Sequence, residues 1–409
     1  MNLFQRWNNT NLILRILGGI VIGVILALLV PQAVGIGFLG TLFVGALKAI
    51  APILVFVLVI SALCRGKANK GSVGRIVLLY IIGTFAAAVT AVIVFSIFPV
   101  TLPLENVTAS AGAASIDIFE QFSTLIKNIL TNPIEAIVNG NFLGLLFWAI
   151  IFGLAFRKTR DSTKSFIHDV ADVLTRVIKW IIAFAPIGVL GLVFTAVSQN
   201  GVDIFIDYGF LIAVLVGTMA CVIFIVNPFI VFTQTHRNPY PLLFTCLRKS
   251  FIPAFFTRSS VANIPINLDL CRSLKLSEAT YSTSIPLGAT INTAGAAVTV
   301  SIMTLACAHT LGIEIPIYMQ IVLCFVAALA ACGTSSVPGG SLLLIPVVCS
   351  LFAIPPDISM QVVGIGFVIS VVQDSVETGL NSSSDVLFTA AVEYRKQRLG
   401  EKAVPADQV

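Results

Sequence analysis

Five polar side chains lie inside one of the most apolar stretches of the chain, residues 361–392. They are Asp374, Glu377, Thr378, Asn381 and Asp385. At about 3.6 residues per turn, these positions share one face of a helix. A carboxylate at the centre of a bilayer costs about 2.5–3.5 kcal/mol even on lenient insertion scales, so several on one span indicate a buried polar pathway. The spacing therefore predicts a site through which something charged passes.

The composition is that of a protein embedded in a membrane. Of the 409 residues, 57% are hydrophobic and 11% are charged, and the mean hydropathy is +1.00. Soluble domains carry about 25% charged residues. The first apolar run ends at Pro31 without a small-residue cleavage motif, so we expect a retained span and not a removed signal peptide. The eight cysteines lie mostly in apolar runs without metal-ligand spacing, which indicates small hydrophobic side chains.

Basic residues account for the formal net charge of +5, because they gather in short segments between the apolar runs. They are Arg65, Lys67, Lys70, Arg75, Arg157, Lys158, Arg160, Lys164, Arg237, Arg248, Lys249, Arg272, Lys275, Arg395, Lys396, Arg398 and Lys402. Such clusters mark the cytoplasmic loops of membrane proteins. We therefore expect both termini in the cytoplasm, a lipid bilayer around the chain and no nucleic-acid partner.

Apolar runs long enough to cross a bilayer make up the first half of the chain. They cover residues 12–30, 36–63, 76–98, 134–156, 175–198 and 208–232. The segments expected on the far side, 31–35, 99–118 and 199–207, contain no lysine or arginine, and the last two carry Glu105, Asp117, Asp203 and Asp207. The alternation predicts six crossings before the chain returns to the cytoplasmic face.

The next apolar segment, residues 240–271, has basic residues at both ends and Thr257-Arg258-Ser259-Ser260 at its centre. A segment flanked by basic residues on both sides enters and leaves from one face, which predicts a re-entrant helical hairpin with a polar tip. Residues 279–308 then cross, with an interruption at Asn292-Thr293-Ala294-Gly295-Ala296.

A second interrupted segment, residues 315–350, is broken by Gly333-Thr334-Ser335-Ser336-Val337-Pro338-Gly339-Gly340. The acidic Glu314 and Asp357 flank it, which predicts a hairpin that enters from the outside. A single Ser-Ser or Gly-Gly pair is more often a packing device or kink. Interruptions from opposite faces, combined with the acidic helix face, favour the inverted repeats and broken helices of a secondary transporter. Non-helical backbone at that depth is tolerated where it lines a cavity, so the tips are candidate binding sites for ions or polar solutes.

These motifs resemble those of the dicarboxylate/amino acid:cation symporters, the family of the glutamate transporters. Thr257-Arg258-Ser259-Ser260 with the following Pro265 is similar to the family's serine-rich tip, and Asn292-Thr293-Ala294-Gly295-Ala296 to its unwound motif. The segment 333–339 resembles its second tip, and Asp374 to Asp385 its final helix. The resemblance covers essentially the whole chain and is strongest to bacterial members that carry serine and threonine.

The resemblance implies an all-helical fold of eight transmembrane helices and two oppositely oriented re-entrant hairpins, placed in a bacterial inner membrane as a homotrimer. Scaffold helices 1 and 2 would occupy 1–75 and scaffold helices 4 and 5 would occupy 119–207. A transport domain would combine helix 3 in 76–118 with helix 6, hairpin 1, helix 7, hairpin 2 and helix 8 in 208–396. Residues 397–409 would form a cytoplasmic tail. The transport domain would move against the scaffold to give alternating access.

Two departures from the family pattern bear on substrate and ion. Members that carry acidic amino acids have an arginine three residues after the Asp374 equivalent, whereas this chain has Glu377, which would repel an anionic side chain. The substrate is therefore expected to be a small neutral amino acid. Ala294 replaces the family's intramembrane aspartate and Ala296 its threonine, so we expect fewer coupled sodium ions than in the acidic amino acid carriers.

Substrate contacts are expected from both tips and the final helix. Asp374 would hold the ammonium group, since a carboxylate is the simplest partner for a buried cation. Asn381 and the backbone of Ser259 and Ser260 would bind the carboxylate, while Glu377 and Thr378 would bind a hydroxyl, which suits serine and threonine. The second tip would close over the solute with Thr334, Ser335, Ser336, Val337 and Gly339.

Sodium is the expected coupling ion, and we expect no cofactor. Asp385 is the clearest ligand, with carbonyl groups near Gly288, Asn292 and Asn381, because hard cations prefer oxygen. The resemblance places a second sodium near Thr334 and Thr290. For Arg258 we favour an ion pair with Glu377, the alternative being a side chain that extends to cytoplasmic water.

Three other classes of function are weighed against this prediction. An ion channel also places polar residues at the membrane centre, and a carrier of the same family could transport a dicarboxylate or be coupled to protons through Glu377. An enzyme is not expected. The histidines, His168, His236 and His309, lie at expected helix ends or loops and show no metal-protease spacing.

Overall fold

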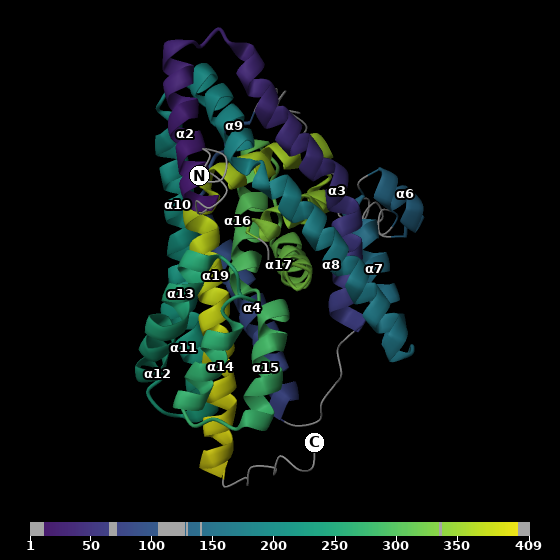
Figure 1. Ribbon diagram of the computed structural model, residues 1–409, viewed down its shortest axis with the longest axis vertical. Helices are drawn as coiled ribbons and strands as arrows, with labels where there is room; N and C mark the ends of the chain where they lie inside the picture. Colours follow the sequence, from purple (N-terminus) through teal and green to yellow (C-terminus); the bar gives the residue numbers. More distant parts are fainter. Residues whose placement is uncertain are drawn as a thin grey trace, which may run out of the picture.

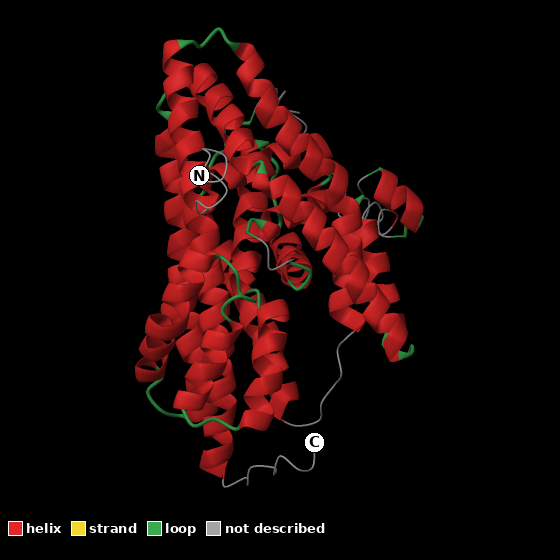
Figure 2. Ribbon diagram, viewed as in Figure 1, coloured by secondary structure: helices red, strands yellow, loops and turns green. Residues whose placement is uncertain are grey.

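The apolar sequence folds into helices. The structure is a computed structural model that describes residues 12–64, 72–104, 127, 130–139, 141–334 and 338–399. Within those ranges every regular element is helical and no strand occurs (Figure 2). The predicted all-helical class is therefore confirmed. By length and composition, five of the described helices could cross a membrane, or six if one bent pair counts as a single span.

One group of helices comes from the N-terminal half. Helix α2 (Leu12–Leu29) packs along α9 (Ala185–Asn200), and α3 (Gly37–Cys64) contacts α7 (Phe142–Phe156), α8 (Asp161–Ala183) and α9. Figure 1 shows these helices as the upper and right-hand part of the molecule. The α2–α9 contact depends on glycine, because a Cβ on Gly19 would stand 2.2 Å from the carbonyl oxygen of Pro186. Small residues allow such close approach of two backbones.

A second group surrounds the longest helix, α19 (Pro356–Leu399), which runs through 44 residues. Against it pack α10 (Ile204–Cys221) and α11 (Asn227–Thr235), which are joined by the π-helical turn η2 (Val222–Val226). Helix α4 (Ser72–Ile97) belongs to this group although it lies early in the sequence, since it packs against α15 (Glu278–Ile291), α16 (Ala294–Thr310) and α17 (Ile317–Ala331).

The interruptions read from the sequence are present as breaks between short helices. The first broken segment comprises α12 (Tyr240–Cys246), the π-helical turn η3 (Leu247–Phe251), α13 (Ile252–Thr257) and α14 (Ile264–Ser273). A gap of two residues separates α15 from α16. After α17 follow η4 (Gly340–Leu344), α18 (Ile345–Cys349) and η5 (Ser350–Phe352).

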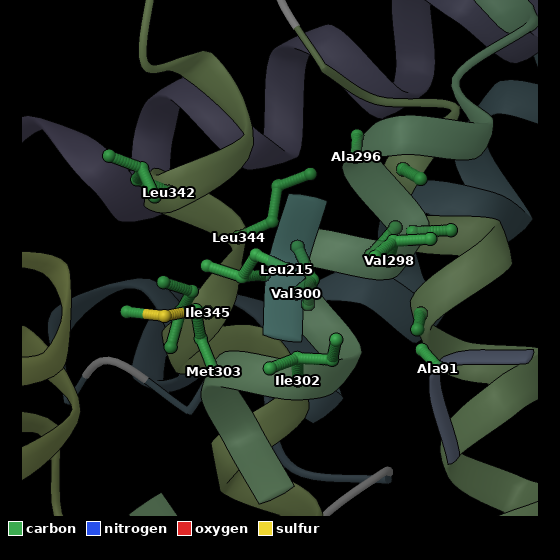
Figure 3. Close-up of a cluster of buried hydrophobic side chains, with 14 of the residues drawn as sticks. Ala91, Leu215, Ala296, Val298, Val300, Ile302, Met303, Leu342, Leu344 and Ile345 are labelled. Carbon is green, nitrogen blue, oxygen red and sulfur yellow. The ribbon is translucent and has the colours of Figure 1, made fainter. Parts of the chain in front are cut away.

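The core of this second group is built around α16. Its residues from Ala294 to Ala308 are all buried, and a helix that is apolar on every side is stable only inside a larger bundle. Figure 3 shows Val298, Val300 and Met303 of α16 among side chains of other elements. Those neighbours are Leu342 and Leu344 of η4, Ile345 of α18, Leu215 of α10 and Ala91 of α4. Helix α16 therefore packs between η4 and α18 of the second broken segment and the helices α4 and α10.

Two predicted spans have other boundaries in the structure. The run 134–156 is divided into α6 (Pro133–Val138) and α7, because the side chains of Asn132 and Asn141 each accept a backbone N–H at a helix start. The run 175–198 spans a bend of 51° between α8 and α9, next to Pro186. Helix α19 also extends three residues into the segment 397–409 predicted as a tail, while residues 400–409 lie outside the described chain.

Candidate functional site

The predicted polar face of α19 lies inside the protein, where the breaks of the other segments meet it. Asp374, Glu377, Thr378, Asn381 and Asp385 are all buried in α19. A cavity of about 30 Å³ is lined by Arg258, Ser260, Ala289, Thr293, Thr334, Ser341, Asp374, Glu377, Thr378 and Asn381. These residues come from the tip after α13, from α15 and the gap after it, from the segment after α17, from η4 and from α19. The sequence therefore identified the elements that meet at the cavity.

Asp374 forms a buried ion pair with Arg258. The Nε of Arg258 donates to Oδ2 of Asp374 at 2.6 Å, and the two side chains are 4% and 5% exposed. The backbone N–H of Gly339 donates to Oδ1 at 3.1 Å, which ties the second tip to the same carboxylate. Arg258 adopts a left-handed backbone conformation with φ of 50°. The predicted ion pair between Arg258 and Glu377 is wrong, because the guanidinium of Arg258 faces Asp374, which lies one turn before Glu377 on α19.

Glu377 is instead surrounded by neutral hydrogen-bond donors. Its Oε2 accepts from the hydroxyl of Thr299 at 2.8 Å, the hydroxyl of Ser341 at 2.9 Å and the amide Nε2 of Gln373 at 2.6 Å. The amide of Gln373 also donates to the hydroxyl oxygen of Thr299 at 2.7 Å. These three donors were missed by sequence reasoning. Gln373 could have been found as a polar residue four positions before Glu377 on the same helix face.

Asn381 and Asp385 contact the gap between α15 and α16. The backbone N–H of Gly295 donates to Oδ1 of Asn381 at 2.8 Å, which satisfies one of the unpaired donors at the start of α16. The amide of Asn292 lies 2.9 Å from Oδ1 of Asp385 and 3.1 Å from the carbonyl oxygen of Asn381. A Cβ on Gly288 would stand 2.4 Å from the same Oδ1, so only glycine fits there.

This region offers the oxygen atoms that a sodium ion prefers. Oδ2 of Asp385 and Oδ1 of Asn292 are buried and have no hydrogen-bond partner among the described residues. An unpaired carboxylate oxygen in a dry interior is unfavourable unless a cation or donor reaches it. The residues therefore fit a hard cation.

The other predicted site residues are less uniformly placed. Ser260 and Thr334 line the cavity, whereas Ser259 is half-buried and its hydroxyl oxygen accepts the backbone N–H of Ala262. Thr290 is exposed, and its hydroxyl donates to the carbonyl oxygen of Leu287. Ser335, Ser336 and Val337 lie outside the described residues. The second sodium site near Thr290 and Thr334 stays a prediction.

A further set of buried polar residues attaches the first broken segment to α19. The amide of Asn263 donates to the hydroxyl oxygen of Ser382 at 2.8 Å, and the amide of Asn267 donates to the carbonyl oxygen of Ser382 at 3.0 Å. Ser250 in turn donates to Oδ1 of Asn267 at 2.6 Å. All of these side chains are fully buried. The network fixes the tip that carries Arg258 and Ser260 against the polar face of α19.

Broken helices that meet a polar helix in the interior of an apolar bundle define the class of secondary transporters. The chain belongs to the sodium:dicarboxylate symporter family, which matches residues 12–395. The resemblance read from the motifs is thereby confirmed.

Named relatives are similar to the chain over nearly its whole length. It is 54% identical over 399 residues to the serine/threonine transporter SstT of Streptococcus agalactiae serotype Ia, covering 97% of this chain and 99% of that protein. It is 52% identical over 388 residues to the serine/threonine transporter SstT of Streptococcus thermophilus strain LMG 18311, covering 95% and 96%.

Proposed function

We propose that this protein imports serine and threonine together with sodium by alternating access, as a multi-pass protein of a bacterial plasma membrane. Family membership supports the coupling to sodium, and the relatives named for serine and threonine support the substrate class. The observation that carries the proposal is the charge around the cavity. Among the described cavity-lining residues, Arg258 is the one cation and Asp374 and Glu377 are the two carboxylates.

This balance favours a neutral substrate. The guanidinium of Arg258 is already paired with Asp374, and Glu377 has neutral donors only. A substrate with an acidic side chain would bring a second negative charge next to Glu377 without a cation to pair with it. At low dielectric such a contact is strongly unfavourable. A zwitterionic amino acid with a hydroxyl avoids this repulsion.

The proposed substrate contacts follow from the cavity. Asp374 would bind the ammonium group, which requires it to share or exchange its present partner Arg258. Asn381 and the backbone of Ser259 and Ser260 would bind the substrate carboxylate. Glu377 would accept a hydrogen bond from the side-chain hydroxyl, and Thr378 would donate one to it. The N–H of Gly339 and the hydroxyl of Ser341 already bond to Asp374 and Glu377, so substrate contacts to both carboxylates also require the segment around Gly339 and Ser341 to move outward.

The proposed ion site consists of the Asp385 carboxylate with carbonyl oxygens of Gly288, Asn292 and Asn381. When bound, sodium would supply the positive charge that Oδ2 of Asp385 lacks among the described residues. A second ion would bind near Thr334 and Thr290. The methyl side chains of Ala294 and Ala296 offer no ligand oxygen at the start of α16, which supports fewer coupled sodium ions than in the acidic amino acid carriers.

The proposed architecture has eight crossings and two re-entrant hairpins, with both termini in the cytoplasm and three copies in the assembly. The first hairpin would be α12 to α14 and the second α17 to α18. Packing supports the division into a scaffold (1–75 and 119–207) and a transport domain (76–118 and 208–396). Helix α4 contacts α15, α16 and α17, whereas α2 and α3 mainly contact α7, α8 and α9.

The test is uptake into proteoliposomes under an inward sodium gradient, with labelled serine and unlabelled serine, threonine, alanine or aspartate as competitors. We expect strong inhibition by serine and threonine and weak inhibition by aspartate at neutral pH. Replacing external sodium with choline should abolish uptake, whereas a proton-coupled carrier would retain it. Counterflow of labelled serine separates a carrier from a channel. Inhibition by aspartate equal to that by serine would contradict the proposal.

A further inference from the structure

The carboxylate of Glu377 is held by side chains from three separate elements. Thr299 belongs to α16, Gln373 to α19 and Ser341 to η4, and each donates to Oε2 at 2.6–2.9 Å. Thr299 and Gln373 are 0% exposed, and Glu377 is 5% exposed. Every hydrogen bond to this carboxylate from the described residues ends on the same oxygen. Oε2 therefore receives three donors, whereas Oε1 receives none from the described residues.

The donors divide into two kinds by their position. Glu377 and Ser341 line the cavity, whereas Thr299 and Gln373 do not. Thr299 and Gln373 therefore contact the carboxylate from behind, out of reach of a bound solute. Ser341 lies on the segment that would move to admit the substrate, so its hydrogen bond is the one that opening would break. Thr299 and Gln373 are the two donors that would stay in place.

The amide of Gln373 contacts both Thr299 and the Glu377 carboxylate. Its Nε2 donates to Oε2 of Glu377 and to the hydroxyl oxygen of Thr299, while its own Oε1 is buried without a partner among the described residues. A buried acceptor left unpaired is unfavourable, typically by about 1–3 kcal/mol. The amide of Gln373 bridges Glu377 and Thr299, and the hydroxyl of Thr299 is also 3.1 Å from the carbonyl oxygen of Gly295.

We propose that Gln373 and Thr299 are positioning residues that orient the Glu377 carboxylate to accept the hydroxyl of the substrate, and so select hydroxyl amino acids over alanine. This rests on the proposed function and names the basis of its specificity. A site built to bond a hydroxyl discriminates strongly against an analogue that lacks one, because its own polar group is then left unpaired. Alanine would leave the free oxygen of Glu377 in that state. Serine and threonine satisfy it with their O–H.

The test compares two isolated changes with matched controls. Thr299→Val removes the hydroxyl and keeps the volume, and Gln373→Met removes the amide and keeps the length. Thr299→Ser retains the hydroxyl. Ser301→Ala is a control on the same helix, since the hydroxyl of Ser301 is fully buried and has no partner among the described residues. Inhibition constants of serine, threonine and alanine, and the maximal rate, are measured in proteoliposomes for each protein.

Thr299→Val and Gln373→Met should each raise the inhibition constants of serine and threonine roughly tenfold to a hundredfold, as for loss of a hydrogen bond to a charged group. The constant for alanine and the maximal rate should change little, and Thr299→Ser and Ser301→Ala should behave as wild type. A purely structural role would instead shift serine and alanine together, which would overturn the inference.

Failure of the inference differs from failure of the proposed function. If the wild-type protein shows no sodium-dependent serine uptake, the proposed function is wrong. If wild-type uptake is normal and the ratio of the serine to the alanine constant is unchanged in both variants, only the role of Gln373 and Thr299 is wrong. If Gln373→Met does not elute as a folded protein, Thr299→Val decides the question, because it changes no volume on α16.

Discussion

Asp385 is the residue at which sodium dependence should be most sensitive to change. Asp385→Asn keeps the shape of the side chain but removes the negative charge of the carboxylate, whose Oδ2 has no hydrogen-bond partner among the described residues. We expect the sodium concentration for half-maximal serine uptake to rise at least about tenfold, because a hard cation loses its one anionic ligand. The order of inhibition among serine, threonine and alanine should stay the same. The measurement is uptake at varied external sodium.

The matched control for Asp385 is Glu393→Gln. Glu393 is a buried carboxylate two turns further along α19 that accepts the hydroxyl of Thr280 at 2.8 Å and does not line the cavity. Its change should leave sodium dependence near the wild-type value. An unchanged sodium affinity in Asp385→Asn would remove Asp385 from the ion site.

The effects of changing Arg258 and Asp374 on the free energy of unfolding should be strongly coupled, because the two side chains form an ion pair. Arg258→Met leaves Asp374 as a buried charge without a counter-ion, and removing one member of a buried pair costs about 3–5 kcal/mol. The double variant Arg258→Met with Asp374→Asn removes both charges and should recover a large part of that loss. Thermal unfolding in detergent of the two single variants and the double variant gives the coupling energy.

The control for this pair is the combination of Arg258→Met with Glu377→Gln. Since Glu377 is bonded to Thr299, Ser341 and Gln373 and not to Arg258, the two effects should be closer to additive. Stronger coupling to Glu377 than to Asp374 would contradict the ion pair in the structure.

At the scale of elements, the close approach of α2 and α9 predicts that replacing Gly19 lowers the stability of the fold. Gly19→Ala places a Cβ 2.2 Å from the carbonyl oxygen of Pro186, which belongs to backbone and cannot rotate away. Overpacking of this kind costs typically 1–3 kcal/mol. We expect a clear fall in the temperature of thermal unfolding, by several degrees. The adjacent Gly18→Ala should have no such effect, because nothing lies within 4 Å of its Cβ position.

Equal unfolding temperatures for the two alanine variants would mean that α2 and α9 do not approach as described.

The breaks in the other elements are stabilised by polar side chains and not by close backbone contact. The α15–α16 gap is satisfied by Asn381 and Asn292, and the tip after α13 by Arg258, Asn263 and Asn267. Both of these breaks are therefore hydrogen-bonded to α19.

At the scale of the whole molecule, the number of coupled ions should be smaller than in carriers of acidic amino acids. The start of α16 presents Ala294 and Ala296, whose methyl side chains offer no ligand oxygen. The ratio of labelled sodium to labelled serine taken up by proteoliposomes measures the stoichiometry. A ratio equal to that of the acidic amino acid carriers would be incompatible with the loss of a site.

The sequence by itself determined the class of the protein and the helix that carries its site. Asp374 to Asp385 share a face because helical period is a local property, and the polar interruptions at 257–260, 292–296 and 333–340 stand out because a bilayer tolerates so few. A break lies at each of these places, although α16 already begins at Ala294 and the first break extends to residue 263. Residues 335–337 lie outside the described chain.

Only the tertiary structure decided which side chains meet. Arg258 lies 116 positions before its partner Asp374, and Thr299 lies 78 positions before Glu377, so neither contact follows from local spacing. The division of 134–156 and the bend between α8 and α9 also depend on caps and packing that hydropathy does not record. Hydropathy reports how favourable each segment is in lipid. The choice among several nearby carboxylates depends on how the helices pack, because one turn of α19 changes which carboxylate a cation can reach.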